Sequence, residues 1–232
     1  LSFLPLTHIF ERLAGHYVML YSGAAIYYAE SVATVPQNLL EVRPTVLSSV
    51  PRIYEKIYEK VMTLVADSSP LKRLLFDWAM GVGREVVPLL YRDQRPTGWL
   101  GLKFALAQSL VLDKIRAQTG GRIKYAASGG APLSPQIMEF FWIIGLRILE
   151  GYGLTETSPI ITMTQFGKVC PGTVGLPLYE SWNGKPFVKI APDGEILCHG
   201  PNVMVGYWAN PEATAEAIDH EGYFHTGDIG EF

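Results

Sequence analysis

The stretch that decides the fold is IKYAASGGAPLSPQIMEFFWIIGLRILEGYG, residues 123–153. It opens on a short apolar segment, IKYAAS, which reads as a strand and ends in a glycine-rich turn. Ser134 in the N-cap position and Pro135 in the first helical position predict a helix that ends at Gly145. LRILE then reads as the next strand. Strand, turn, helix and strand in this order predict a βαβ unit.

The residues before this unit repeat the same alternation of strand and helix. Strands are expected at SFLPL, AIYYA and TVLSSV, and helices over residues 10–21, 37–42, from 51 onward, 71–91 and 100–119. Alternation of this kind argues for a parallel α/β sheet with flanking helices, in which ligands bind beyond the carboxyl ends of the strands. We assign this α/β subdomain to residues 1–160.

The character of the sequence changes after residue 160. Glycine and proline are frequent in residues 167–186. The segment FVKIAPDGEILCHG predicts a β-hairpin that turns at Asp193 and Gly194. NPEATAEAI predicts a short helix that is capped by Asn210. We therefore expect a second, β-rich subdomain over residues 161–232, cut short at its end.

Composition excludes several classes of protein. A net charge of −3 and the lack of any Lys/Arg run argue against a nucleic-acid partner. The two cysteines lack CxxC spacing and the five histidines lack HExxH spacing, so neither zinc nor a disulfide framework is indicated. The longest apolar run, FFWIIGLRIL, is shorter than the roughly 20 residues of a transmembrane helix. These features predict a cytoplasmic protein with a small-molecule partner.

Two loops carry the groups that could perform chemistry, SGGAPL after IKYAA and GYGLTET after LRILE. Glycines admit a flat ligand close to the backbone, and Tyr152 offers an aromatic face for a base. Thr155 offers a hydroxyl donor to phosphate, and Glu156 offers a carboxylate suited to Mg²⁺. Taken singly, each loop could be only a turn with a cap, and no GxxxxGKS motif is present.

The joint pattern is more specific than either loop. SGGAPLS, GYGLTETSP, DGEILCHGPNVMVGYW and GYFHTGD occur in this order, and together they resemble the core motifs of the adenylate-forming synthetases. LPLTHIFERLAGHY and RPTVLSSVPRIYEKI resemble, more narrowly, the long-chain fatty-acid-CoA ligase branch. The resemblance spans nearly the whole chain. It implies an AMP-binding N-terminal domain, with a parallel-sheet lobe followed by part of a distorted-barrel lobe.

The resemblance also implies roles for individual residues. Tyr152 would stack on adenine, Thr155 would hold the α-phosphate, and Glu156 would bind Mg²⁺. Asp228 would accept hydrogen bonds from both ribose hydroxyls, and His8 would line the acyl-carboxylate side of the pocket. The remaining nucleotide-binding positions implied by the motifs are Ser128, Gly129, Gly130, Ala131, Gly151 and Gly153.

The implied substrates are a fatty acid, ATP and CoA. The full enzyme would form an acyl-adenylate from ATP and a long-chain fatty acid, then transfer the acyl group to CoA, and it could associate peripherally with a membrane. Another adenylate-forming ligase, loading a carrier protein or using an aryl acid, is the nearest alternative. A nucleotide-binding module without turnover is the other alternative.

Three elements of the resembled family have no counterpart in the sequence. They are the lysine-containing phosphate loop, the second ribose-binding arginine, and the small C-terminal domain with its lysine. We therefore expect an internal fragment that is inactive alone. The resemblance places the acyl tunnel along the helix that bears Leu13, Tyr17 and Leu20, with Ser128 and Ile160 near the glycine turns, although such residues are more often plain core.

Overall fold

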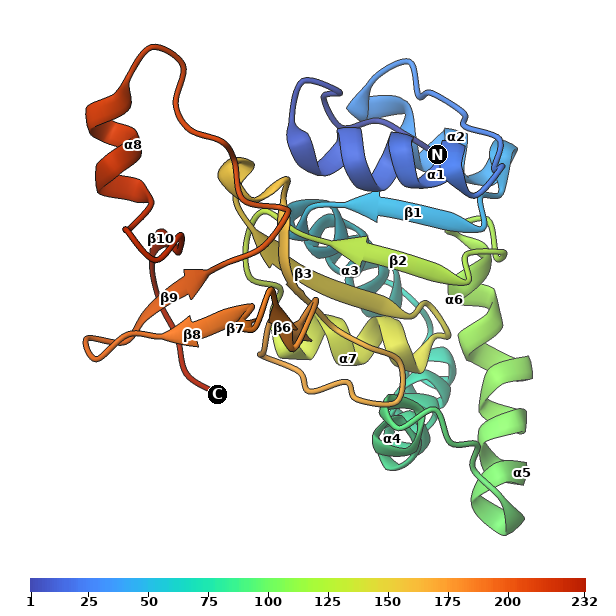
Figure 1. Ribbon diagram of the computed structural model, residues 1–232. Coiled ribbons are helices and arrows are strands. Elements are labelled where there is room, and N and C mark those ends of the chain that lie inside the picture. Colours follow the sequence, from blue (N-terminus) through green and yellow to red (C-terminus); the bar gives the residue numbers. More distant parts are fainter. The chain divides into compact units, whose positions relative to one another are not determined.

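A computed structural model describes every residue from Leu1 to Phe232. The chain forms two compact units. The first unit contains Leu1–Glu150 and Thr164–Thr173, and the second contains Gly151–Met163 and Val174–Phe232. Figure 1 colours the chain from blue to red along the sequence. The sequence-based division into residues 1–160 and 161–232 stays a prediction.

The first unit is built on parallel strands, as predicted. β1 (Val46–Ser49) pairs with β2 (Tyr125–Ser128), and β2 pairs with β3 (Ile148–Gly153), all in parallel (Figure 1). Val46 lies opposite Tyr125, and Ala126 lies opposite Ile148. The carboxyl ends of β2 and β3 therefore carry the SGGAPL and GYGLTET loops.

The prediction of strands at SFLPL and AIYYA is wrong. These segments meet only in a single parallel bridge between Ser2 and Tyr28. Pro5 lacks the N–H group that would extend the ladder, and Tyr27 and Tyr28 remain exposed to solvent. A β-ladder needs repeated backbone pairing, which these residues do not provide.

The helices follow the predicted periodicity closely. They are η1 (Glu11–Tyr17), α1 (Val18–Tyr21), η2 (Val32–Thr34), α2 (Val35–Val42), α3 (Pro51–Ala66), α4 (Pro70–Tyr91), α5 (Gly98–Ala107), η3 (Gln108–Leu112), α6 (Asp113–Ala117) and α7 (Pro135–Ile143). No helix combines the length and the apolar composition needed to cross a lipid bilayer.

Helices α3 and α7 fasten the strands of the first unit through buried polar contacts. The Tyr54 hydroxyl in α3 donates to the Ala127 carbonyl in β2 at 2.9 Å. The Trp142 indole in α7 donates to the Ile148 carbonyl in β3 at 2.9 Å. Tyr54 and Trp142 are almost fully buried beside Phe141, so the strand ends are held by a rigid core.

The second unit is antiparallel. The end of β3 pairs with β4 (Ile160–Met163), and β4 pairs with β5 (Leu176–Pro177). β8 (Val188–Ile190), β9 (Glu195–Cys198) and β10 (Phe224–Ile229) form an open three-stranded sheet. A short ribbon joins β6 (Ser181–Trp182) to β7 (Lys185–Pro186). None of these sheets closes into a barrel.

Two local predictions in the second unit are confirmed. The hairpin between β8 and β9 turns at Asp193 and Gly194, where Gly194 has a φ of +93° that favours glycine. Helix α8 (Pro211–Ala217) begins after Asn210, whose side-chain oxygen accepts a hydrogen bond from the Ala213 N–H at 3.1 Å. The small core of this unit gathers around Ile161 and Phe187.

Candidate functional site

The predicted site residues divide between the two compact units. His8 and Ser128–Ala131 belong to the first unit. The GYGLTET loop and Asp228 belong to the second unit.

Tyr152 and Asp228 are 76 residues apart in the chain, yet their side chains meet. The Tyr152 hydroxyl donates a hydrogen bond to Asp228 Oδ2 at 2.7 Å. Burial is the main cause that raises the pKa of Tyr152, so the phenol stays protonated and acts as a donor. The contact fixes one oxygen of the Asp228 carboxylate beside the aromatic ring that was predicted to stack on adenine.

The irregular part of β10 that presents Asp228 is held by three further hydrogen bonds. Thr226 donates from Oγ1 to the Ile196 carbonyl at 2.7 Å, and the Asp228 N–H donates back to Thr226 Oγ1 at 3.1 Å. The Gly227 N–H donates to Glu195 Oε1 at 2.8 Å. These contacts anchor this part of β10 to strand β9, so the position of Asp228 depends on residues outside the HTGD motif.

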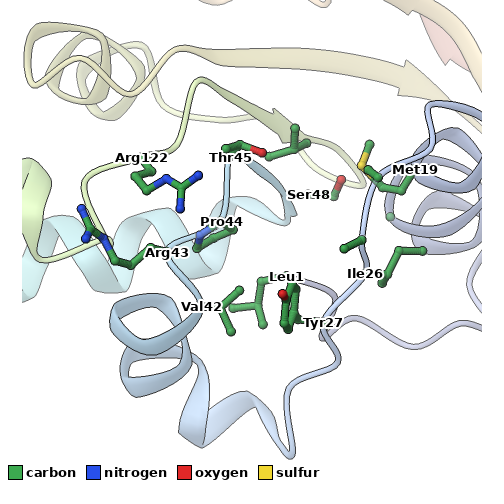
Figure 2. Close-up of a pocket in the computed structure, with 14 residues that line it drawn as sticks. Leu1, Met19, Ile26, Tyr27, Val42, Arg43, Pro44, Thr45, Ser48 and Arg122 are labelled. Carbon is green, nitrogen blue, oxygen red and sulfur yellow. The ribbon is translucent and has the colours of Figure 1, made fainter.

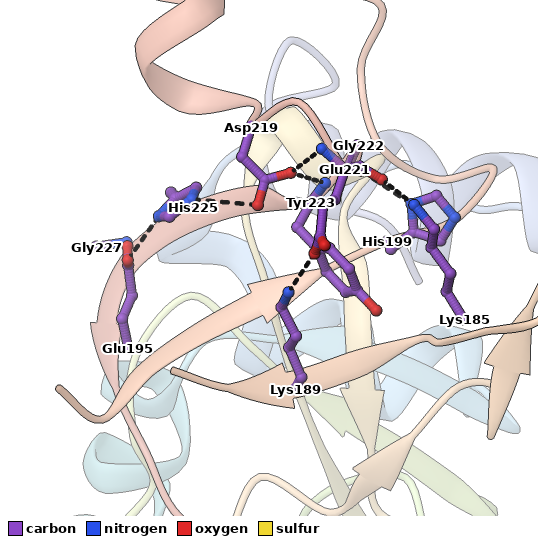
Figure 3. A network of polar contacts seen from close by, with 10 residues as sticks. All are labelled: Lys185, Lys189, Glu195, His199, Asp219, Glu221, Gly222, Tyr223, His225 and Gly227. Atoms are coloured by element: carbon purple, nitrogen blue, oxygen red, sulfur yellow. Dashed lines mark hydrogen bonds and ion pairs between the residues drawn. The ribbon is translucent and has the colours of Figure 1, made fainter. Parts of the chain in front are cut away.

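Glu195 lies at one end of a polar network in the second unit (Figure 3). Its Oε2 lies 2.7 Å from Nδ1 of His225, while Nε2 of His225 lies 3.8 Å from Asp219. Burial is the largest single influence and would raise the pKa of Asp219, but backbone N–H donors at Tyr223 and Glu221, together with the charge of Lys189, lower that pKa below its usual value. Asp219 therefore stays ionised beside the imidazole.

Sequence reasoning did not assign a role to Glu195. The available signal was a carboxylate directly after the Asp193–Gly194 turn, at the start of the second strand of the predicted hairpin. Its partner could not be read from the sequence, since β9 and β10 are separated by α8 and two loops.

Replacing Glu195 with alanine is expected to lower the free energy of unfolding of the protein by about 1–3 kcal/mol. The reason is that both the Gly227 N–H and the His225 ring lose their acceptor. Urea-induced unfolding followed by circular dichroism measures the effect. Glu216→Ala, an exposed change on α8, is the matched control. Equal stability of the two variants would contradict the anchoring role.

Glu156 lies in a single 3₁₀ turn, η4 (Thr155–Thr157). Its Oε1 accepts a hydrogen bond from the Tyr207 hydroxyl at 3.0 Å, and this bond is the main cause that raises the pKa of Tyr207. The Met204 N–H donates to the Glu156 carbonyl at 2.7 Å. Thr157 is fully buried and donates to the Pro159 carbonyl at 2.7 Å, which closes the turn.

The surroundings of Glu156 fit a magnesium ligand. Tyr207 occupies one carboxylate oxygen, and Oε2 accepts no hydrogen bond from the chain. Thr155, one residue earlier, is exposed and forms no side-chain hydrogen bond. Mg²⁺ commonly uses one or two carboxylates together with phosphate oxygens, so one free carboxylate oxygen next to a free hydroxyl suits it. No group of three or more His, Cys, Asp or Glu side chains gathers to bind a metal without such help.

In the first unit, the SGGAPL loop is shaped by close contacts. A Cβ on Gly129 would lie 3.2 Å from the Phe10 ring, and Gly130 has a φ of +83°. Ser128 is buried, and its hydroxyl has no hydrogen-bond partner. Ala131 is exposed. The loop therefore combines a Ser128 hydroxyl that has no hydrogen-bond partner with two glycines that carry no side chain.

Glu150 is a second residue that sequence reasoning missed. Its Oε1 accepts a hydrogen bond from the Leu133 N–H at 3.0 Å, which ties the end of β3 to the SGGAPL loop. Oε2 is buried without a partner. Burial is the main cause that raises the pKa of this carboxyl. A charged residue at the end of the apolar strand LRILE was the available signal.

His8 lies in an exposed turn before η1, and its Nδ1 accepts a hydrogen bond from the Phe10 N–H at 3.2 Å. The helix that follows was predicted to line the acyl tunnel. Tyr17 and Leu20 point to solvent, and Leu13 is half-buried.

A cavity of about 300 Å³ opens beside the same helix (Figure 2). Met19 lines it on the helix side, together with Ile26, Tyr27 and Val42, and the side chains of Arg43 and Arg122 contribute positive charge. None of the predicted nucleotide residues lines this cavity. The cavity is therefore a separate feature of the first unit.

The sequence is similar to those of known enzymes over nearly its whole length. A family profile described as AMP-binding enzyme matches residues 1–208. Long chain acyl-CoA synthetase 6, peroxisomal, of Arabidopsis thaliana is 37% identical over 99% of this chain and 33% of its own length. The chain spans only 33% to 39% of the length of this relative and of seven other curated relatives that it matches.

Solved structures show the same fold. Apo MatB of Rhodopseudomonas palustris matches with a TM-score of 0.62 and 26% identity, over 99% of this chain and 37% of that protein. A malonyl-CoA ligase in a ternary product complex with methylmalonyl-CoA and AMP matches with a TM-score of 0.58 and 25% identity, over 98% of this chain and 40% of that protein. Both agree with the predicted α/β class.

Proposed function

We propose that this chain, which belongs to the AMP-binding enzyme family, supplies the adenine, ribose and Mg²⁺ determinants of a long-chain fatty-acid-CoA ligase. The fatty carboxylate would attack the α-phosphate of ATP, giving an acyl-adenylate and pyrophosphate. The thiol of CoA would then take the acyl group and release AMP. The long-chain acyl-CoA synthetases among the relatives support this substrate class.

The contact between Tyr152 and Asp228 is the observation that carries the proposal. It joins the two motifs expected to hold adenine and ribose, from distant parts of the sequence. With Tyr152 stacked on adenine, Asp228 would accept hydrogen bonds from the vicinal ribose hydroxyls. Gly151 and Gly153 would leave the backbone open to the base. In the first unit, Ser128 to Ala131 are proposed as nucleotide-binding residues on the ground of the family motif.

The phosphate end of the site would be held by Thr155 and Glu156. The Thr155 hydroxyl would donate to the α-phosphate, and Glu156 Oε2 would bind Mg²⁺, which neutralises charge on the phosphates. His8 would line the acyl-carboxylate side. Positioning of this kind, with fixed donors at the reacting phosphate, is the main source of rate enhancement in such reactions.

The unpaired Cys170 and Cys198 support the expected cytoplasmic location.

Fatty-acid-dependent exchange of pyrophosphate into ATP tests this function in the natural protein at its full length. Palmitate should drive exchange in the presence of Mg²⁺, and Asp228→Ala should raise the KM for ATP by at least about tenfold, since two charge-assisted hydrogen bonds are lost. Asp67→Ala, an exposed change after α3, is the matched control. An unchanged KM in Asp228→Ala would refute the ribose assignment.

Adding CoA separates the proposed reaction from its nearest alternatives. Release of palmitoyl-CoA supports the fatty-acid-CoA ligase, whereas exchange without thioester would indicate another acceptor, such as a carrier protein. Exchange with an aryl acid but not with palmitate would indicate another acid. A folded protein that binds AMP but exchanges with no acid would leave only nucleotide binding.

A further inference from the structure

A second cavity of the first unit lies at the amino ends of β2 and β3. Lys124 and Tyr125 line it where β2 begins, and Arg147 lines it directly before β3. Helix α6, which lies beside the amino end of β2 in Figure 1, contributes Arg116. The cavity has a volume of about 370 Å³, which is typical of small-molecule sites. The SGGAPL loop leaves the opposite end of β2, and none of the predicted nucleotide residues lines this cavity.

All the charged side chains that line this cavity are positive. They are Arg116, Lys124 and Arg147, and no Asp or Glu is among the lining residues. Arg147 donates to Asp93 at 3.1 Å, and Arg116 lies 3.7 Å from Asp113. Both of these carboxylates are more than half exposed, and ion pairs at such positions are weak. Lys124 forms no ion pair. The three cations are therefore available to a bound anion.

The two arginines are held in position by the residues around them. The Arg147 guanidinium lies 5.8 Å from the ring centroid of buried Trp142, which is a cation–π contact. A Cβ on Gly145 would lie 3.1 Å from Nη1 of Arg116, so the missing side chain leaves room for that guanidinium. Gly145 also has a φ of +83°, which favours glycine. A guanidinium that is already positioned loses less entropy for each hydrogen bond that it forms with an oxyanion.

The remaining wall of the cavity is largely apolar. Phe104 and Ile123 are buried residues that line it, and Leu90 is half-buried. Tyr125 is 45% exposed, and its ring centroid lies 5.1 Å from that of Phe166. A partly exposed aromatic ring can stack on another flat ring. A small inorganic anion would leave these apolar contacts unused, whereas an organic anion would use them together with the cations.

We propose that this basic cavity binds an organic phosphate with an aromatic or apolar body. A phosphate monoester carries a charge of about −1.5 to −2 at pH 7, which complements three cations better than a single carboxylate does. Arginines bind phosphate oxygens through parallel N–H donors, and Lys124 would add a point charge. The body of the ligand would lie against Leu90, Phe104 and the ring of Tyr125. The proposal concerns binding alone, so its test needs no fatty acid, CoA or turnover.

Isothermal titration calorimetry of the natural protein at full length tests the proposal, with 1-naphthyl phosphate as the probe. Inorganic phosphate and 1-naphthol should each bind at least about tenfold more weakly, because each makes only part of the contacts. Lys124→Gln and Arg147→Gln should each weaken binding of the probe about tenfold, because a charge-assisted hydrogen bond is lost. Arg122→Gln removes an exposed cation two residues before Lys124 that lines the other cavity, and it should bind the probe as wild type does.

Acetylation of surface lysines, read by mass spectrometry, locates the contact without any substitution. Saturating 1-naphthyl phosphate should protect Lys124, whereas Lys114, an exposed lysine of α6 outside the cavity, should stay fully reactive. The proposal would be overturned if the probe did not bind, if Lys124→Gln and Arg147→Gln bound it as wild type does, or if inorganic phosphate bound as tightly. It would also be overturned if only Tyr152→Ala abolished binding, since the probe would then lie at the proposed nucleotide site.

Discussion

Glu156→Gln is expected to lower the rate of fatty-acid-dependent pyrophosphate exchange by about 10²–10³-fold, the cost typical of removing one preorganised electrostatic contact. In the native protein the Tyr207 hydroxyl donates to Glu156 Oε1 at 3.0 Å. Glutamine has nearly the same shape as glutamate, so its amide oxygen can still accept this hydrogen bond. The turn η4 is held by Thr157 and by the backbone contact with Met204, neither of which changes. The substitution therefore removes the charge and little else.

Pyrophosphate exchange at saturating ATP, measured over a range of Mg²⁺ concentrations, checks this prediction. The lost charge should raise the Mg²⁺ requirement as well as lower the maximal rate, because the carboxylate is proposed as the ligand. Glu212→Gln, an exposed change in the first turn of α8, should behave as wild type. A Glu156→Gln enzyme with normal rate and normal Mg²⁺ dependence would rule out the metal-binding role.

Gly153→Ala is expected to lower the free energy of unfolding by about 3 kcal/mol, at the upper end of the cost of overpacking. A Cβ on Gly153 would overlap the Pro159 carbonyl oxygen and would lie 3.1 Å from the Ile161 nitrogen. Both are backbone atoms, so relief requires strand β4 to move. The same movement would displace the GYGLTET loop, and we expect weaker ATP binding.

Gly151→Ala, two residues earlier in the same strand, is the control for stability. A Cβ there would lie 3.7 Å from the Thr162 carbonyl oxygen, which is ordinary van der Waals contact. Urea-induced unfolding of the two variants side by side isolates the steric effect from the general cost of changing glycine. Equal losses of stability would mean that close approach to Pro159 is not what requires glycine at this position.

Much of the first unit could be predicted because its signals are local. The helix start at Pro135, the stop at Gly145 and the apolar rows of α3 and α7 lie within a few turns of chain. The expected strands around Pro5 and Tyr27 failed because a strand needs a partner along its length. Apolar composition alone does not report whether that partner is present.

The sequence by itself determined the α/β class, the family motifs and their order, because these depend on residue type and on spacing along the chain. Only the tertiary structure decided that Tyr152 meets Asp228, that Tyr207 meets Glu156, and that Glu195 anchors the Gly227 backbone. It also decided that Trp99, Leu102 and Leu106 remain exposed to solvent. The physical reason is that hydrogen bonds and burial depend on distance in space, and residues 30 to 76 positions apart are brought together, or left exposed, only by the packing of whole elements.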